Sequence, residues 1–217
     1  MARENREVRN FASFEMRAAD AGIEGGIVEG YASTFDKYEL WSYEGREYTE
    51  IWTEEIDPHA FDAADMTDVI FLRDHAGQVY ARTKNNLITL TIDEHGLFTR
   101  TDLTRTTGAR EMYEDITAGN YTQMSFAFTV AADEITIRDE IKDTGVIYYE
   151  RKISAIEKVY DISAVARPAN PNTDISAATR AAFNGAIEQY RTERSKLEAR
   201  AREQTRQALL LKMKIGG

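Results

Sequence analysis

Cysteine is absent from the 217-residue chain, and histidine and proline occur only three times each. The lack of cysteine excludes disulfides, zinc sites with thiolate ligands, iron–sulfur clusters and a cysteine nucleophile. No apolar run reaches the roughly 18 residues of a transmembrane helix. The first eight residues mix both charge signs where a secretory signal peptide needs an apolar core. We therefore expect a soluble protein, without a membrane partner, that does not use the usual secretory route.

Charge is unevenly distributed along the chain. The formal net charge is −10, yet residues 180–217 contain nine basic and four acidic residues and carry a net charge of +5. The preceding residues contain 18 basic and 33 acidic side chains and carry a net charge of −15. The chain is thus an acidic body with a basic tail. The negative net charge argues against wholesale nucleic-acid binding, so we do not expect nucleic acid as a partner.

Strand-like segments and turn sequences alternate through the body of the chain, which predicts a mostly β fold with one or two helices. The alternation over residues 87–92, a turn at 93–96 and a return as far as 103 predict a β-hairpin. A helix is expected from Thr107, its N-cap, to Gly119, and a short capped helix after Asp57 and Pro58. Further strands are expected at 27–35, 48–51, 69–72, 121–130, 145–153 and 159–166.

The composition changes after residue 171 to alanine, arginine, glutamate and glutamine, which favours one long helix over about residues 176–213. Arg194 and Gln204 interrupt its seven-residue apolar pattern, so an isolated coiled coil is not expected. The helix either docks on the body or on another copy, or it becomes ordered on a partner. The chain thus divides into a flexible N-terminal arm over residues 1–10, which can pair with the body or stay free, a β domain over 11–171 and a basic helical tail over 172–217.

Two residues stand where a nucleophile and a base can be presented. Ser125 alternates with Met124 and Phe126 along a strand, so its hydroxyl lies on the less hydrophobic face. His75 follows an apolar strand within a polar loop, where an imidazole can act as a base near neutral pH. A serine on a solvated strand face and an incidental loop histidine are the alternative interpretations.

A serine nucleophile also needs a third group that orients its base. Asp161 shares a strand face with Ser163 and is the first candidate, and Glu157 is the reserve. His59 and His95 lie in a predicted short helix and a predicted turn, where solvated roles are expected. The three histidines share no metal-ligand spacing, and no phosphate or dinucleotide motif is present, so neither a metal nor a cofactor is expected.

Six segments, in this order, resemble the prohead proteases of tailed double-stranded-DNA phages, capsid-maturation serine peptidases with a fold similar to that of the herpesvirus assemblins. Each segment is unspecific alone, and together they span roughly residues 26–171. The matching segments are Gly30-Tyr31-Ala32-Ser33-Thr34-Phe35, Ile56-Asp57-Pro58-His59-Ala60-Phe61, residues 69–75, Asp93-Glu94-His95-Gly96-Leu97, Met124-Ser125-Phe126-Ala127-Phe128 and residues 161–169.

The resemblance implies a closed or nearly closed β-barrel with peripheral helices and a long C-terminal helix. It also implies that Ser125 is the nucleophile, His75 the general base and Asp161 the residue that orients His75. The sequence departs from the family pattern at two places. His59 stands where glycine is usual, and Arg73-Asp74-His75-Ala76 replaces the commoner Asn-His-Asp form.

The family's biology implies a serine endopeptidase that cleaves scaffold and major capsid protein inside the procapsid, in the host cytoplasm during assembly, and that also cleaves itself. The basic tail is then a recruiting handle or a first substrate. The herpesvirus relatives suggest a homodimer, for which the sequence identifies no interface. The alternative is a non-enzymatic scaffolding or structural component of capsid assembly that keeps the same barrel.

Overall fold

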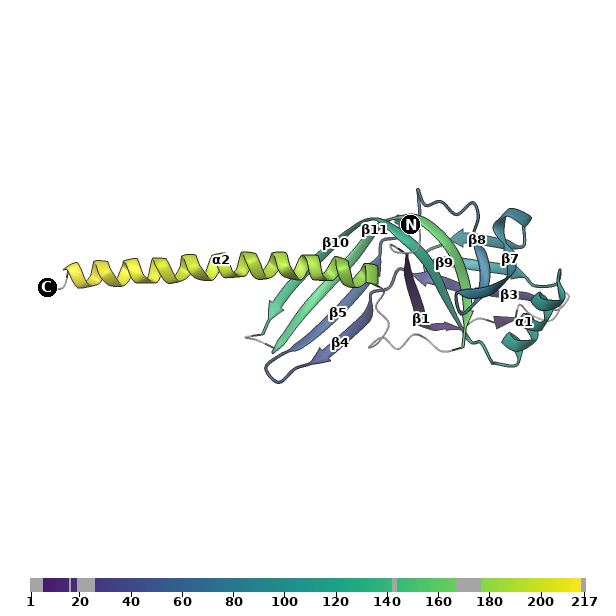
Figure 1. The fold of residues 1–217 in the computed structure, drawn as a ribbon, viewed down its shortest axis with the longest axis horizontal. Coiled ribbons are helices and arrows are strands. Elements are labelled where there is room, and N and C mark those ends of the chain that lie inside the picture. Colours follow the sequence, from purple (N-terminus) through teal and green to yellow (C-terminus); the bar gives the residue numbers. More distant parts are fainter. Residues whose placement is uncertain (1–5, 16, 19–25, 142–143, 167–176, 216–217) are drawn as a thin grey trace. The chain divides into compact units, whose positions relative to one another are not determined.

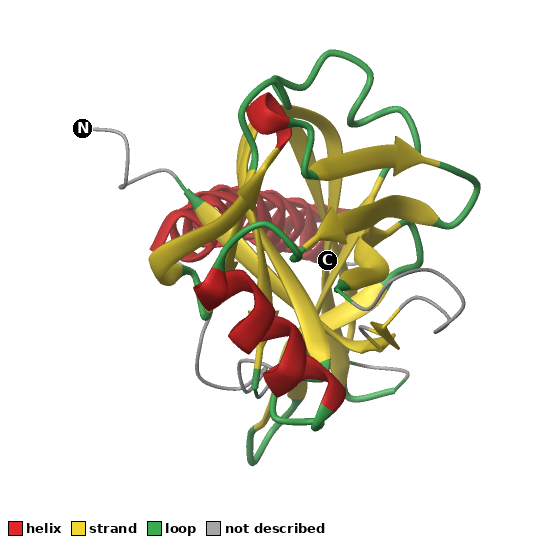
Figure 2. Cartoon of the chain, turned by 90° about the vertical axis from the view of Figure 1, so that its right-hand side faces the viewer, coloured by secondary structure: helices red, strands yellow, loops and turns green. Residues whose placement is uncertain are grey.

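The computed structural model of the protein describes residues 6–15, 17–18, 26–141, 144–166 and 177–215. The chain forms two compact units, Met1–Thr179 and Arg180–Gly217. Strands make up most of the first unit, as Figures 1 and 2 show. Nearly all of the second unit is helix α2, which begins in the first unit and spans Ala177–Ile215. The mostly β character and the long C-terminal helix expected from the sequence are confirmed.

The first sheet has seven strands and carries the residues of interest. Its order is β1-β10-β11-β5-β4, and β6 pairs with both β11 and β7. The strands are β1 (Glu7–Glu15), β4 (Tyr38–Glu44), β5 (Thr49–Ile56), β6 (Ile70–Arg73), β7 (Ala76–Arg82), β10 (Gln123–Glu140) and β11 (Val146–Val165).

Strands β10 and β11 form one long antiparallel hairpin that curves across the first unit (Figure 1). The prediction of separate strands at 145–153 and 159–166 is wrong, because β11 runs unbroken through both. Its first part pairs in parallel with β5 and its last part with β6. Four register shifts interrupt the pairing of β10 with β11 between Ala127 and Asp133, and irregularities of this kind let a long hairpin bend.

The second sheet has the order β2-β3-β9-β8, formed by Arg17–Ala18, Ile27–Thr34, Gly96–Asp102 and Ile88–Ile92. The hairpin predicted over residues 87–103 is confirmed as β8 and β9. Gly96 allows β9 to approach β3, since a Cβ there would lie 2.0 Å from the Ser33 carbonyl oxygen. Strand pairing among the described residues leaves two separate sheets, so the closed barrel stays a prediction.

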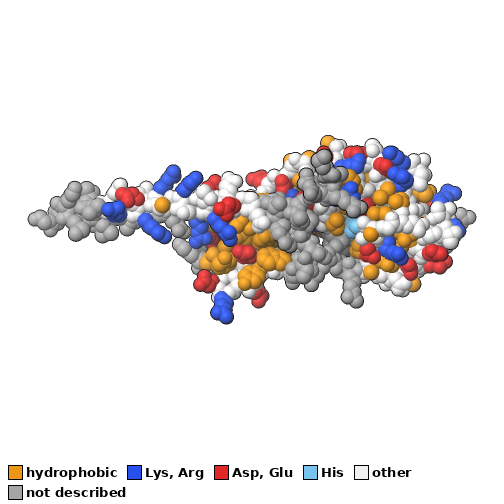
Figure 3. Space-filling view, in the orientation of Figure 1, with side chains coloured by type: hydrophobic (Ala, Val, Ile, Leu, Met, Phe, Trp, Pro, Cys, Tyr) orange, Lys and Arg blue, Asp and Glu red, His pale blue; other side chains and the backbone are white. Residues whose placement is uncertain are grey.

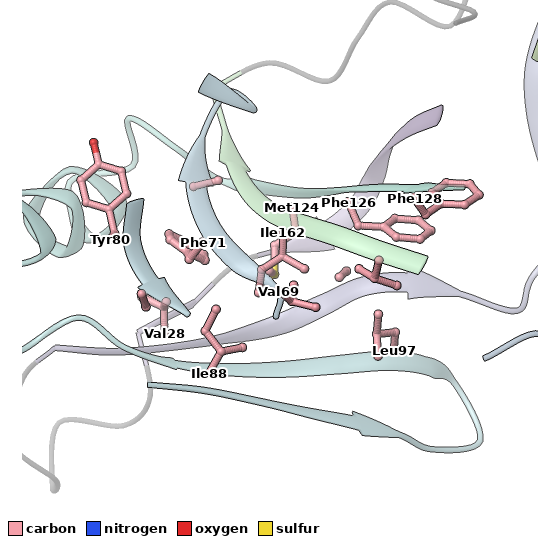
Figure 4. Packing of buried hydrophobic residues seen from close by; sticks show 14 of the residues in the cluster. Val28, Val69, Phe71, Tyr80, Ile88, Leu97, Met124, Phe126, Phe128 and Ile162 are labelled. Atoms are coloured by element: carbon pink, nitrogen blue, oxygen red, sulfur yellow. The ribbon is translucent and has the colours of Figure 1, made fainter. Parts of the chain in front are cut away.

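A continuous hydrophobic core fills the space between strands of the two sheets. Met124, Phe126 and Phe128 of β10 point into it and are at most 1% exposed, as the strand alternation predicts. Figure 4 shows these side chains beside Ile162 of β11 and Leu97 of β9. The opposite face of β10 is therefore the face that presents Ser125.

Helical segments are few in the first unit. Helix α1 (Thr107–Thr117) buries Ala109, Met112 and Ile116, and its N-cap is Thr106, one residue before the predicted one. The short helix expected after Asp57 is wrong. Residues 58–63 form turns, in which Ala60 N–H donates to the Asp57 carbonyl at 2.8 Å. A 3₁₀ turn, η1, spans Thr83–Asn85.

The structure bears on the predicted N-terminal arm but not on the predicted boundary before the tail. Residues 7–10, placed in the predicted arm, belong to β1 and pair with β10. The expected boundary between residues 171 and 172 lies outside the described residues, so the predicted division into arm, domain and tail stays a prediction.

Basic and acidic side chains are interspersed along α2 on the face shown in Figure 3. None of the helices within the described ranges is long and apolar enough to cross a membrane.

Candidate active site

His75 lies in a two-residue turn that connects β6 to β7, with Arg73 paired to Ala76 across the hairpin. Both central residues have positive φ angles, 47° for Asp74 and 56° for His75. Positive φ at both central positions is the requirement of a type I′ hairpin turn, which favours Asn-Gly or Asp-Gly. A non-glycine residue held in this region costs on the order of 1 kcal/mol or more, and such residues cluster at functional sites.

Three hydrogen bonds with β11 and with Ala166, the residue that follows it, hold this turn in place. The Asp74 N–H donates to the Ala164 carbonyl at 3.0 Å. The His75 N–H donates to the Ser163 hydroxyl oxygen at 3.2 Å. The Asp74 carboxylate accepts a longer bond, 3.4 Å, from the Ala166 N–H. The turn therefore takes its position from β11, the strand that also carries Asp161.

Strand register brings the remaining groups to the same face of the sheet. Ser125 of β10 lies opposite Ser163 of β11, and Ala127 lies opposite Asp161. Ser125 is 0% exposed and Asp161 is 2% exposed, whereas the His75 side chain keeps 19% of its surface exposed. The site is thus a buried serine and a buried carboxylate joined by a partly accessible imidazole.

His75 bridges the other two predicted residues. Its Nδ1 lies 2.6 Å from Asp161 Oδ1, and its Nε2 lies 2.5 Å from Ser125 Oγ. A carboxylate can only accept, so Nδ1 carries the proton, and Nε2 presents its lone pair to the Ser125 hydroxyl. This is the geometry in which an imidazole can remove a proton from a serine.

The Ser125 hydroxyl has a second acceptor in β1. Its Oγ lies 2.9 Å from the carbonyl oxygen of Arg9. A serine hydroxyl has one proton, so a bond donated to Arg9 competes with one donated to His75. Sequence reasoning missed this contact, because residues 1–10 were interpreted as an arm.

A buried cluster of charges fixes β1 beside β10. Arg9 lies between Glu54, with Nε–Oε1 at 2.5 Å, and Glu7, with Nη2–Oε2 at 2.6 Å. Arg151 Nη1 contacts the same two carboxylates at 2.7 and 2.9 Å. Burial alone would raise the pKa of Glu7, but the hydrogen bond from Arg151 and the charges of Arg9 and Arg151 outweigh it and lower that pKa to about 2. Glu7 and Arg9 alternate with Val8, and this alternation was the one signal in the sequence that these residues form a strand whose charged face is buried.

The other candidates lie elsewhere. Glu157, the reserve third residue, is exposed, and its backbone carbonyl accepts a hydrogen bond from Asp65. His59 is exposed and lies 3.2 Å from Asp62. His95 is exposed in the β8–β9 turn, 3.8 Å from Glu94. The structure thus brings together His75, Ser125 and Asp161 and leaves the alternatives outside this group.

A model of the family described as caudovirus prohead serine protease matches residues 12–186. The chain belongs to this family. The match covers most of the chain and includes all three residues of the constellation. It begins after Phe11, so the prohead protease match leaves out the part of β1 that contains Arg9. Searches of the curated proteins and of the solved structures gave no significant match.

Proposed function

We propose that this prohead protease family member is a serine endopeptidase in which Ser125 is the nucleophile, His75 the general base and Asp161 the residue that orients His75. The observation that carries the proposal is the chain of two short contacts, 2.5 Å from His75 Nε2 to Ser125 Oγ and 2.6 Å from His75 Nδ1 to Asp161 Oδ1. The positive φ of His75 supports it, because a histidine held at this cost is typical of a functional position.

The reaction is acyl transfer in two halves. Ser125 Oγ attacks the carbonyl carbon of a peptide bond while His75 Nε2 takes the hydroxyl proton. The tetrahedral intermediate then collapses, the C–N bond breaks, and the imidazolium returns the proton to the departing amine. A water molecule, deprotonated by His75, releases the acyl group and restores Ser125. Asp161 stays ionised, fixes the tautomer of His75 and stabilises the imidazolium.

Membership in the prohead protease family supports a role in capsid maturation. The substrates we propose are segments of the scaffold protein and of the major capsid protein, cleaved within the procapsid in the host cell, together with the protein's own termini. We propose that backbone N–H groups near Arg167 bind the oxyanion, and this residue lies outside the described ones. A homodimer remains a proposal that follows from the herpesvirus relatives.

Covalent labelling tests the chemistry directly. A fluorophosphonate should label the wild-type protein once, at Ser125, and should not label Ser125→Ala or His75→Ala. Ser33→Ala is a matched control, since Ser33 is a fully buried strand serine whose hydroxyl donates within β3, to the Thr34 carbonyl. An unlabelled wild-type protein would instead favour the non-enzymatic assembly component.

Self-cleavage has its own test, the intact mass of concentrated protein after incubation. Discrete loss of terminal pieces from the wild type, and full-length Ser125→Ala, would support autocleavage and locate its sites. If the full-length mass persists in both, the same pair should be co-expressed with the capsid and scaffold proteins. Intact capsid and scaffold proteins beside the wild type would then refute the proposed substrates.

The helical tail is proposed as the recruiting element. Deleting residues 172–217 should leave the β domain folded while its incorporation into procapsids is lost. Incorporation of the shortened protein at the wild-type level would refute this role. The experiment also tests the predicted division between the β domain and the tail.

A further inference from the structure

Ser163 is a buried hydroxyl that the reaction above does not use, yet it contacts two parts of the proposed site. It is 0% exposed and lies directly opposite Ser125 in the pairing of β11 with β10. Its Oγ lies 3.0 Å from Asp161 Oδ1, 3.3 Å from His75 Nδ1 and 3.2 Å from the His75 backbone nitrogen. No other described side-chain hydroxyl makes contacts with both His75 and Asp161.

The proton positions around Ser163 follow from what each partner can do. Asp161 is an acceptor only, so the His75 Nδ1–H and the Ser163 hydroxyl both donate to its Oδ1. The backbone N–H of His75 is a donor only, so it donates to Ser163 Oγ. Ser163 therefore receives one bond from the main chain of His75 and gives one to the carboxylate that orients the same residue.

We propose that Ser163 is a positioning residue for the proposed serine peptidase: it fixes the strained turn that carries His75 and aligns the Asp161 carboxylate with the imidazole. The inference rests on the proposed function and deepens it. The turn needs such support because Asp74 and His75 both have positive φ without being glycine. Charge-assisted donation from Ser163 also restrains rotation of the carboxylate, as a second bond beside the one from His75 Nδ1.

Loss of the hydroxyl has two predicted effects at once. In Ser163→Ala the His75 N–H loses its acceptor and Asp161 Oδ1 loses one of its two donors. The imidazole can then move with its turn, and a misplacement of about 1 Å in an active site lowers the rate by about 100-fold. The inactivation rate constant for a fluorophosphonate should fall by at least about tenfold, with little change in the concentration needed for half-saturation. Ser163→Thr keeps the hydroxyl and should restore most of the rate.

The low-field proton resonance of the His75 Nδ1–H gives a readout independent of activity. It reports the bond to Asp161 and should shift or vanish in Ser163→Ala, return in Ser163→Thr and stay unchanged in the buried control Ser33→Ala. Urea unfolding of each variant would confirm that the compared proteins are folded. If Ser163→Thr does not fold, the labelling rates and resonances of Ser163→Ala and Ser33→Ala are compared, and that comparison decides whether Ser163 has the positioning role.

The outcomes separate the two proposals. A labelling rate within twofold of wild type together with an unchanged resonance in Ser163→Ala would overturn the positioning role. An equal loss of rate in Ser33→Ala would also overturn it, because the effect would then be a general one of removing a buried hydroxyl. Failure of wild-type labelling would refute the peptidase itself, whereas the resonance would still decide whether Ser163 orients His75 and Asp161.

Discussion

Glu7 should make a pH-dependent contribution to stability through the buried charge cluster that holds β1 beside Ser125. Its pKa is lowered from 4.5 to about 2 in the folded protein. A depression of this size corresponds to about 3 kcal/mol, since one unit is about 1.4 kcal/mol. Because the folded-state pKa is the lower one, the stabilisation is complete above about pH 4.5 and is lost as the pH falls toward 2.

Replacing Glu7 by glutamine removes this titration while keeping the shape of the side chain. We expect the free energy of unfolding, from urea titrations, to fall by about 3 kcal/mol at pH 6. The difference from wild type should shrink as the pH is lowered from 4.5 to 2, because the wild-type carboxylate then becomes protonated too. Glu157→Gln, an exposed change on β11, is the matched control and should stay within about 0.5 kcal/mol of wild type.

The pH dependence is the decisive part of this experiment. A Glu7→Gln variant that is destabilised equally at pH 6 and at pH 3 would show that the loss comes from packing or neutral hydrogen bonds. A variant as stable as wild type at pH 6 would refute the charge cluster as the anchor of β1. This second result would also remove the basis for treating Arg9 as a firmly held neighbour of Ser125.

Three further changes test the site and the fold. Asp161→Asn should lower the fluorophosphonate labelling rate by about 10⁴-fold while the protein stays folded, because the amide can donate to His75 Nδ1 and stabilise the wrong tautomer of the imidazole. A loss of less than tenfold would contradict the proposal that Asp161 orients His75. Phe126→Ala should lower the unfolding free energy by about 3–5 kcal/mol, as expected for a fully buried phenylalanine, and a loss below 1 kcal/mol in urea would refute its place in the core. Gly96→Ala should lower the free energy of unfolding by more than about 1 kcal/mol, because the added Cβ would meet the Ser33 carbonyl oxygen. An unchanged melting temperature would contradict that close approach.

Local periodicity was sufficient to predict the face on which Ser125 lies. Along β10, Met124, Phe126 and Phe128 alternate with smaller or polar residues, and a period of two determines which side chains share a face. The β8–β9 hairpin was predictable for the same reason, with a turn sequence between two alternating segments. These features depend on neighbours within a few residues, which a single sequence displays.

The missed features depend on partners far away in the chain. The turn at Asp74 and His75 lacks the glycine that marks a type I′ hairpin, so β7 had no local signal. Strand β1 is held by ion pairs from Arg9 to a residue 45 positions away and from Glu7 to one 144 positions away. No local pattern predicts such pairs, and a charged segment is otherwise typical of a solvated arm.

The site combines several costly features, and this combination bears on the choice between a peptidase and an inactive assembly component. His75 has a positive φ, Asp161 is a carboxylate that is 2% exposed, and Ser125 is a polar group without exposed surface. Each is destabilising by itself, because strained backbone and buried polar groups need compensation from their surroundings. A component that acts only through its surface would gain stability from a glycine in the turn and apolar residues on the two strands. Costs of this kind are expected where a base, a nucleophile and an orienting carboxylate are needed together, and they therefore support the proposed peptidase over the inactive component.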